Sequence, residues 1–255
     1  MSGSVVAVVQ ARVSSSRLPG KVLKTILGEP MIVRQLERIR HCRLVSRIAV
    51  ATSTDASDDP LAAVCANAGF PVHRGSLADV LDRFYRCAAS FAPDHVVRMT
   101  GDCPVIDPAV ADGVIRYHLD GGYDFTSNAL QPTFPDGLDV EVVRFAALER
   151  TWREAHLPSE REHVMPYIYA HPELFRIGHF KSETDRSHLR WTVDEPEDFE
   201  LIRQLYEELL PGKPAFSMED ILAVLETNPR LAAVNRGFKR NEGLEKSRAQ
   251  DRKDG

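Results

Sequence analysis

The sequence predicts an α/β fold in which helices flank a largely parallel sheet. Short apolar runs rich in β-branched residues, such as residues 4–9, are typical of strands covered on both faces. These runs alternate with stretches such as residues 30–41, where apolar side chains recur at helical spacing. Because strands that alternate with helices are joined by parallel crossovers, this order indicates an α/β sheet. A chain of 255 residues, 43% of them hydrophobic, can bury the core of one large domain.

The first half of the chain carries the regular part of this alternation. In the helix expected at residues 30–41, Ile32, Leu36 and Ile39 are spaced to face the core. The other elements expected before residue 100 are strands at 4–9, 47–52, 70–73 and 95–99 and helices at 59–68 and 77–90. Parallel strands of this kind end at one common edge of the sheet, where open α/β folds bind ligands.

The second half is less regular from residue 123 onward. Its expected elements are strands at 139–144, 175–180 and 189–193 and helices at 145–156, 159–170, 196–209 and 218–225. No internal repeat or Gly/Ser-rich linker interrupts the chain, so residues 1–235 are expected to form a single domain. Residues 236–255 carry seven Lys or Arg and four Asp or Glu but few apolar residues, which predicts a disordered tail.

The composition limits the classes of partner. A net charge of -5 gives no general attraction to polyanions, so neither nucleic acid nor an anionic membrane is an expected partner. The four cysteines are scattered without a C-x-x-C pair, which is typical of reduced thiols and a cytoplasmic location. No segment approaches the roughly 18 apolar residues that a membrane span needs.

The loop from Gln10 to Lys21 directly follows the first predicted strand. Arg12, Arg17 and Lys21 supply cations, its serines supply hydroxyl donors, and Gly20 allows close backbone approach to an anion. A solvated Arg/Ser-rich loop with a Pro-Gly turn is the alternative, but the position after a buried strand favours anion binding. The residues leave open whether that anion is phosphate or carboxylate, and the P-loop pattern is absent.

Two carboxylates follow later strands. Asp102 comes just after the strand at 95–99, and Asp107 is better placed to cap the next helix, which leaves Asp102 available for function. Asp194 follows the strand expected at 189–193 and precedes a helix that opens at Pro196, so a helix cap is as plausible for it as metal ligation. Magnesium usually takes one or two protein carboxylates and completes its shell with water and phosphate.

Three further clusters have structural explanations beside functional ones. Asp136 forms a turn signal with Gly137, and Asp139 and Glu141 would then project from one face of a strand. A capping box formed by Ser159 and Glu162 would explain the segment that carries Arg161 and His163. Arg83 could instead form a solvent-exposed ion pair with Asp79, which lies four residues before it on the same predicted helix.

Three motifs together resemble one family. They are the loop at residues 10–23, Gly-Asp-Cys-Pro at 101–104 and Thr-Val-Asp-Glu-Pro-Glu-Asp at 192–198. They look like the marks of the cytidylyltransferase family that contains CMP-Kdo synthetase and acylneuraminate cytidylyltransferase, and most closely its spore coat polysaccharide F group. The resemblance covers residues 5–235. It implies a Rossmann-like nucleotidyltransferase fold with a mixed, mostly parallel sheet, and a homodimer with residues 139–144 as a candidate contact.

The resemblance also implies roles for individual residues. Magnesium would bind to Asp102 and Asp194. Catalytic roles fall on Arg12, Lys21 and Asp102. Nucleotide binding falls on Ala11, Arg12, Arg17, Gly20, Lys21, Ser53, Arg83 and Asp102. Acceptor binding falls on Asp136, Asp139, Glu141, Arg161 and His163.

The implied reaction is in-line attack by an acceptor oxygen on the α-phosphate of CTP, with release of pyrophosphate. The acceptor would be a small sugar-like acid or a similar acidic or phosphorylated molecule used in polysaccharide or glycoconjugate synthesis. Two alternatives remain at this point, a glycosyltransferase that uses a nucleotide sugar and a non-catalytic nucleotide-binding scaffold. Gly-Asp-Cys-Pro stands where a glycosyltransferase usually carries Asp-x-Asp, which favours the cytidylyltransferase.

Overall fold

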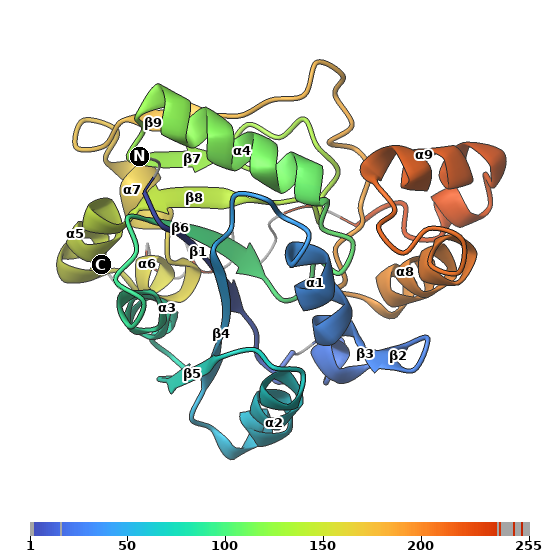
Figure 1. Ribbon diagram of the computed structural model, residues 1–255, viewed down its shortest axis with the longest axis horizontal. Coiled ribbons are helices and arrows are strands. Elements are labelled where there is room, and N and C mark those ends of the chain that lie inside the picture. Colours follow the sequence, from blue (N-terminus) through green and yellow to red (C-terminus); the bar gives the residue numbers. More distant parts are fainter. Residues whose placement is uncertain (1–2, 16, 239, 241–246, 248–250, 252–255) are drawn as a thin grey trace.

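Strand β1 (Val5–Gln10) lies inside a seven-stranded sheet of order β5-β4-β1-β6-β8-β7-β9, and its apolar residues are buried on both faces (Figure 1). The computed structural model describes residues 3–15, 17–238, 240, 247 and 251. Four neighbouring strands run parallel, namely β5 (Val72–Gly75), β4 (Arg47–Ser53), β1 and β6 (His95–Thr100). Their carboxyl ends therefore meet at one edge of the sheet.

The other three strands make the sheet mixed. Strand β8 (Glu141–Arg144) runs antiparallel to both β6 and β7 (Phe125–Ser127), and β9 (Ile177–His179) pairs in parallel with β7 at the edge. The mostly parallel sheet flanked by helices is thus confirmed. Strand β8 is paired on both sides and its residues Glu141 to Val143 are buried, and the dimer contact expected at residues 139–144 stays a prediction.

The alternation of side chains along β1 divides the core in two. Val5, Ala7 and Val9 pack with the larger core, while Val6 and Val8 pack with the smaller one. The larger core lies under α1 (Met31–Ile39), α2 (Asp59–Asn67), α4 (Pro108–Gly121), α8 (Pro196–Leu209) and α9 (Met218–Thr227). The smaller core lies under α3 (Val80–Ala89), α5 (Phe145–Glu154) and α7 (Pro166–Ala170).

Two sequence-based predictions of regular structure are wrong. Residues 189–193 are not a strand, because only Asp136 and Arg190 form an isolated bridge, while Trp191 and Val193 alternate into the core and imitate a strand pattern. The helix expected at 159–170 is two helices, α6 (Pro158–His163) and α7, because Val164 adopts a φ of 73° between them.

Several short elements escaped the sequence patterns. They are strand β7, the hairpin of β2 (Thr25–Ile26) and β3 (Glu29–Pro30), and the 3-10 helices η1 (Lys21–Leu23), η2 (Ala56–Asp58) and η3 (Leu231–Ala233). Each spans two or three residues, which is too short to show a period.

Most of the tail from residue 236 lies outside the described residues. The disorder predicted for the tail therefore concerns mainly residues that the structure does not describe. Arg240 is described and forms an ion pair with Asp139, and Asp251 accepts a hydrogen bond from the backbone of Ser159 at 3.2 Å. Across the part of the chain that the structure describes, no helix is long and apolar enough to cross a bilayer.

Candidate active site

The loop after β1 is fastened to the end of β4 by a single carboxylate. Asp58 accepts a hydrogen bond from the backbone of Val13 at 2.7 Å through one oxygen and binds the hydroxyl and backbone of Ser53 through the other. Gly20 has a φ of 69°, a left-handed conformation that glycine adopts without strain, and it leads directly into Lys21. The end of the loop is therefore held in one conformation where it approaches the carboxyl edge of the sheet.

Lys21 lies between the two carboxylates that the sequence predicts to bind metal. Its ammonium nitrogen is 3.1 Å from Asp102 Oδ2 and 2.9 Å from Asp194 Oδ1, and it also donates to the carbonyl of Val193 at 2.7 Å. Burial by itself lowers the pKa of Lys21, but the charges of Asp102 and Asp194 outweigh it and raise that pKa above its ordinary value. Lys21 is thus a fixed cation at this site.

Asp102 is positioned by the end of β6 and by the segment before α8. Its side chain accepts from the Thr100 hydroxyl at 2.5 Å, and its carbonyl accepts from the backbone of Val193 at 2.8 Å. Burial raises the pKa of Asp102, yet Lys21 and the Thr100 hydrogen bond hold it at about 2. Asp102 is therefore ionised at neutral pH.

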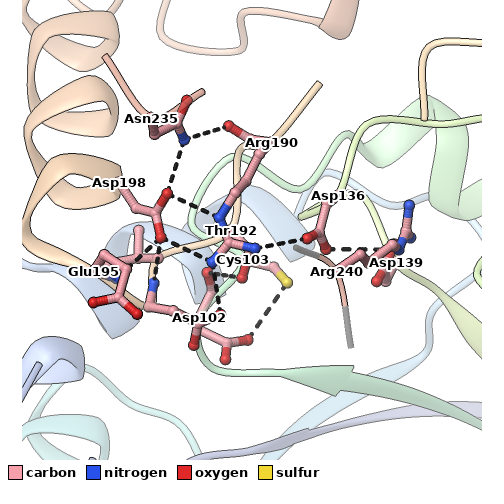
Figure 2. A network of polar contacts seen from close by, with 12 residues as sticks. Asp102, Cys103, Asp136, Asp139, Arg190, Thr192, Glu195, Asp198, Asn235 and Arg240 are labelled. Atoms are coloured by element: carbon pink, nitrogen blue, oxygen red, sulfur yellow. Dashed lines mark hydrogen bonds and ion pairs between the residues drawn. The ribbon is translucent and has the colours of Figure 1, made fainter. Parts of the chain in front are cut away.

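Asp194 does not cap α8. The N-cap is Glu195, and Asp198 completes a capping box with it by accepting from the backbone N–H of Glu195 at 3.0 Å. Asp198 also accepts from the backbone N–H of Asp194 at 2.9 Å. The helix-cap explanation of Asp194 is therefore wrong. Its carboxylate instead contacts Lys21, Arg17 at 3.0 Å and Arg190 at 2.9 Å. Figure 2 shows Arg190 reaching from Asp198 on one side to Asp136 on the other.

Two hollows meet at Asp102 and Asp194. The first, about 390 Å³ and here called the loop-side hollow, is lined among others by Gln10, Ala11, Arg12, Lys21 and Arg83. The second, about 270 Å³ and here called the acid-lined hollow, is lined among others by Arg98, Asp136, Asp139, Glu141 and Arg190. Both are also lined by Arg17, Thr100, Asp102, His163 and Asp194. The two predicted metal ligands therefore stand at the boundary between the two hollows.

The loop-side hollow contains two arginines without a carboxylate partner within the described ranges. Arg12 is exposed, and Arg83 is only 2% exposed, with its NH1 donating to the carbonyl of Ser76 at 2.5 Å and its Nε unpartnered. The interpretation of Arg83 and Asp79 as a solvated pair is therefore wrong. Burial lowers the pKa of Arg83, so an anion in this hollow would stabilise its charge.

The acid-lined hollow balances its carboxylates with arginines from other segments. Arg98 forms an ion pair with Glu141 and also donates to Gln10 at 2.8 Å, which links this hollow to the loop after β1. Asp139 pairs with Arg240. Burial, reinforced by the nearby negative charges of Asp136 and Glu141, nevertheless raises the pKa of Asp139 to about 7.

Not every predicted site residue reaches a hollow. Ser53 is buried against Asp58 and lines neither hollow. Arg161 likewise lines neither, since its guanidinium binds both carboxylate oxygens of Asp79 at 3.0 and 2.5 Å. His163 lines both hollows and lies 2.9 Å from the Ser247 hydroxyl.

The expected capping box of Ser159 and Glu162 is also wrong. Glu160 performs the capping instead, by accepting from the backbone N–H groups of His156 and Leu157, both at 3.0 Å. Helix α6 begins at Pro158, one residue before the expected cap, because a proline suits a first helical position.

Comparison with known proteins places the chain in one family. The model of the cytidylyltransferase family matches residues 6–221. Over 240 residues the chain is 33% identical to the spore coat polysaccharide biosynthesis protein SpsF of Bacillus subtilis. The alignment covers 89% of this chain and 96% of that protein. The chain belongs to the cytidylyltransferase family. The expected enzyme class, a CTP-dependent nucleotidyltransferase, is thereby confirmed.

Solved structures agree with this assignment. A cytidylyltransferase from Leptospira borgpetersenii superposes with a TM-score of 0.86 at 31% identity, over 93% of this chain and 99% of that one. A CMP:2-keto-3-deoxy-manno-octonic acid synthetase in complex with CTP superposes with a TM-score of 0.61 at 20% identity, over 81% of this chain and 100% of that one, a likeness of fold. The Rossmann-like nucleotidyltransferase fold expected from the motifs is confirmed.

The donor set of this cytidylyltransferase fits a magnesium ion. Asp102 and Asp194 each direct one oxygen to the same point, now held by Lys21, and carboxylate oxygens are ligands that Mg²⁺ prefers. Among the described residues, no group of three His, Cys, Asp or Glu side chains could hold a metal. A bound ion would therefore depend on water and phosphate oxygens for the rest of its shell.

Sequence reasoning missed the arginines that organise the acid-lined hollow. Arg190 stands four residues before Asp194, and Arg98 lies on β6 four residues before Asp102. For Arg190 this spacing was an available signal, since its guanidinium reaches Asp194 at 2.9 Å, whereas Arg98 pairs with Glu141 and not with Asp102. Arg240 offered no such signal, because it meets Asp139 only through the tertiary fold.

Proposed function

We propose that this cytidylyltransferase transfers CMP from CTP to a sugar acid, or to a similar acidic or phosphorylated acceptor, in polysaccharide or glycoconjugate precursor synthesis, with Mg²⁺ as cofactor. One observation carries the proposal. The cation-bearing hollow and the acid-lined hollow lie side by side and share Asp102 and Asp194 as lining residues. This is the arrangement that in-line attack on an α-phosphate needs, with the nucleotide on one side of the carboxylates and the acceptor on the other.

The loop-side hollow is suited to a triphosphate. Arg12 and Arg83 face it without carboxylate partners in the described part of the chain, so their charges are available to phosphate oxygens. Arginine binds phosphate through paired hydrogen bonds of fixed geometry. Lys21 adds a buried positive charge beside the reacting phosphate, where a low-dielectric surrounding strengthens it. These residues would bind and orient CTP and stabilise charge on its phosphate oxygens.

Asp102 and Asp194 would hold the magnesium ion, which when bound neutralises phosphate charge and lowers the pKa of an acceptor oxygen nearby. The chain itself keeps Asp102 ionised, because Lys21 and Thr100 depress its pKa. Asp102 is thus in the protonation state that a metal requires. Asp194 is oriented by three charged donors, Lys21, Arg17 and Arg190.

The acid-lined hollow is suited to a molecule with many hydroxyl groups. Asp136, Asp139 and Glu141 accept hydrogen bonds, and sugar hydroxyls donate them. The negative group of the acceptor would lie toward Arg17 and His163, which line the boundary of both hollows. In that orientation the hydroxyls would position the attacking oxygen near Asp102.

The test is pyrophosphate release by the purified protein. Reactions contain Mg²⁺ and one of CTP, UTP, GTP or ATP, with a panel of sugar acids, sugar phosphates and neutral sugars. We expect release that requires both CTP and an acidic acceptor, with a CMP-linked product by mass spectrometry. Equal rates with all four nucleotides, or product formed only with neutral sugars, would contradict the proposal.

The homodimer implied by the sequence resemblance is part of the proposal. Sedimentation velocity at micromolar concentration measures it directly. A single species at the monomer mass of 28.5 kDa would contradict it.

A further inference from the structure

Arg190 is a buried arginine that contacts three carboxylates at once. Its side chain is 8% exposed, and its guanidinium nitrogens lie 3.0 Å from Asp136 and 2.9 Å from Asp198 (Figure 2). A guanidinium nitrogen also lies 2.9 Å from Asp194. These carboxylates come from the acid-lined hollow, the first turn of α8 and the predicted metal site, respectively. The planar fork of arginine can serve several acceptors in fixed directions, which a lysine cannot do.

The contact with Asp194 fixes the direction of that carboxylate. Arg190 donates to Asp194 Oδ2, whereas Lys21 donates to Oδ1. Because Arg190 holds Oδ2 of Asp194, Oδ1 is directed to the same point as the Asp102 carboxylate. Rotation of the Asp194 side chain would break one of these contacts.

Arg190 is itself held in place from the far side. Asp198, which is 0% exposed, binds Arg190 through both carboxylate oxygens at 3.0 and 2.9 Å. Asn235 donates to Asp198 at 2.8 Å and to the carbonyl of Arg190 at 2.9 Å. The backbone N–H of Asp194 also donates to Asp198. The main chain and the side chain of Asp194 are therefore both hydrogen-bonded to the ion pair of Arg190 and Asp198.

We propose that Arg190 is a positioning residue for the metal site, which orients the Asp194 carboxylate toward the divalent cation. The inference rests on the proposed function, since it takes Asp194 as a metal ligand. Groups that orient metal ligands from behind typically change metal affinity or activity by 10-fold to 100-fold when they are replaced. Because Arg190 also binds Asp136, the orientation of the metal ligand is coupled to the wall of the acid-lined hollow.

The experiment measures Mn²⁺ binding to the full chain in the presence of CTP by electron paramagnetic resonance. Arg190→Lys keeps the charge but removes the fork, and we expect the Kd for Mn²⁺ to rise at least tenfold. Arg203→Lys is the matched control, because Arg203 lies on α8 and pairs with Glu200 and Glu207 away from both hollows. In that variant the Kd should stay within twofold of the parent value.

The same substitution, made in an Asp194→Asn protein, distinguishes an effect on the orientation of Asp194 from a general effect on stability. In Asp194→Asn, the further change Arg190→Lys should alter the Mn²⁺ Kd by less than twofold, because the ligand that Arg190 orients has gone. A lower thermal midpoint with an unchanged Mn²⁺ Kd in Arg190→Lys would overturn the inference. An unchanged Kd in Asp194→Asn alone is a different result, which overturns the metal assignment of the proposed function and the inference with it.

If Arg190→Lys is not recovered as a folded protein, Asn235→Ala takes its place. This change removes the two hydrogen bonds that hold Arg190 and Asp198 and leaves every ion pair intact. We expect a rise of about threefold in the Mn²⁺ Kd, and an unchanged value would count against the inference.

Discussion

The loop-side hollow and the acid-lined hollow meet at the same two carboxylates, but they balance charge in opposite ways. On the loop side, Arg12 and Arg83 have no carboxylate partner in the part of the chain that the structure describes. On the acid side, the three carboxylates that line only this hollow each have an arginine partner, in the pairs Asp136 with Arg190, Asp139 with Arg240, and Glu141 with Arg98.

Under the proposed function, this difference would let one site select two unlike ligands. A triphosphate carries several negative charges, so excess positive charge suffices to attract and hold it. A sugar-like acceptor is distinguished by the directions of its hydroxyl groups, and rigid carboxylates held in ion pairs can recognise these directions. Four changes test the difference, from the largest expected effect to the smallest.

Asp102→Asn affects the boundary that both hollows share. We expect kcat for pyrophosphate release to fall about 1000-fold, because the change removes a proposed metal ligand and a partner of Lys21. Steady-state kinetics with CTP and an active acceptor measure it. Asp120→Asn on the exposed side of α4 is the control, and equal losses in both variants would refute a special role for Asp102.

Arg12→Ala tests the loop side. Loss of one charge-assisted hydrogen bond to phosphate costs about 1.5–3 kcal/mol, so the KM for CTP should rise about tenfold to a hundredfold. The KM for the acceptor should stay within twofold. Exposed Arg43→Ala serves as the control, and a larger effect of Arg12→Ala on the acceptor than on CTP would reverse the assignment of the two hollows.

The acid side should respond to pH through Asp139. With its pKa raised to about 7, this carboxyl gains a proton as pH falls from 8 to 6 and no longer accepts hydrogen bonds as a carboxylate. The ionised fraction falls about tenfold over this range, and the KM for the acceptor should rise by about the same factor. Asp139→Asn should remove that part of the pH profile. A profile identical in both proteins would exclude Asp139 as its origin.

Ser53→Ala should have the smallest effect on kinetics. The hydroxyl of Ser53 binds Asp58 and faces neither hollow, so the KM for CTP should stay within twofold. Loss of the hydrogen bond should instead reduce the free energy of unfolding by about 1–2 kcal/mol, as measured by urea denaturation. A rise of more than fivefold in the KM for CTP would restore Ser53 as a nucleotide-binding residue.

The sequence predicted the loop-side hollow better than the acid-lined hollow, because the signals for the loop side are local in the sequence. Lys21 and Asp102 follow strands with clear apolar runs, and strand ends at one edge of a parallel sheet are brought together by topology. Asp194 was placed correctly although residues 189–193 form no strand, because their alternation still directs Val193 into the core. Arg161 was misjudged because its partner, Asp79, is 82 positions away.

By itself, the sequence determined the parallel half of the sheet and the positions of the loop after β1 and of the two carboxylates, since apolar periodicity and strand-end position are local properties of the chain. Only the tertiary structure decided how those carboxylates are held. Lys21, Arg17 and Arg190 converge on Asp194 from separate segments. Which oppositely charged side chains meet depends on packing between distant elements, because burial makes each unpaired charge costly and the fold selects the partners that remove this cost.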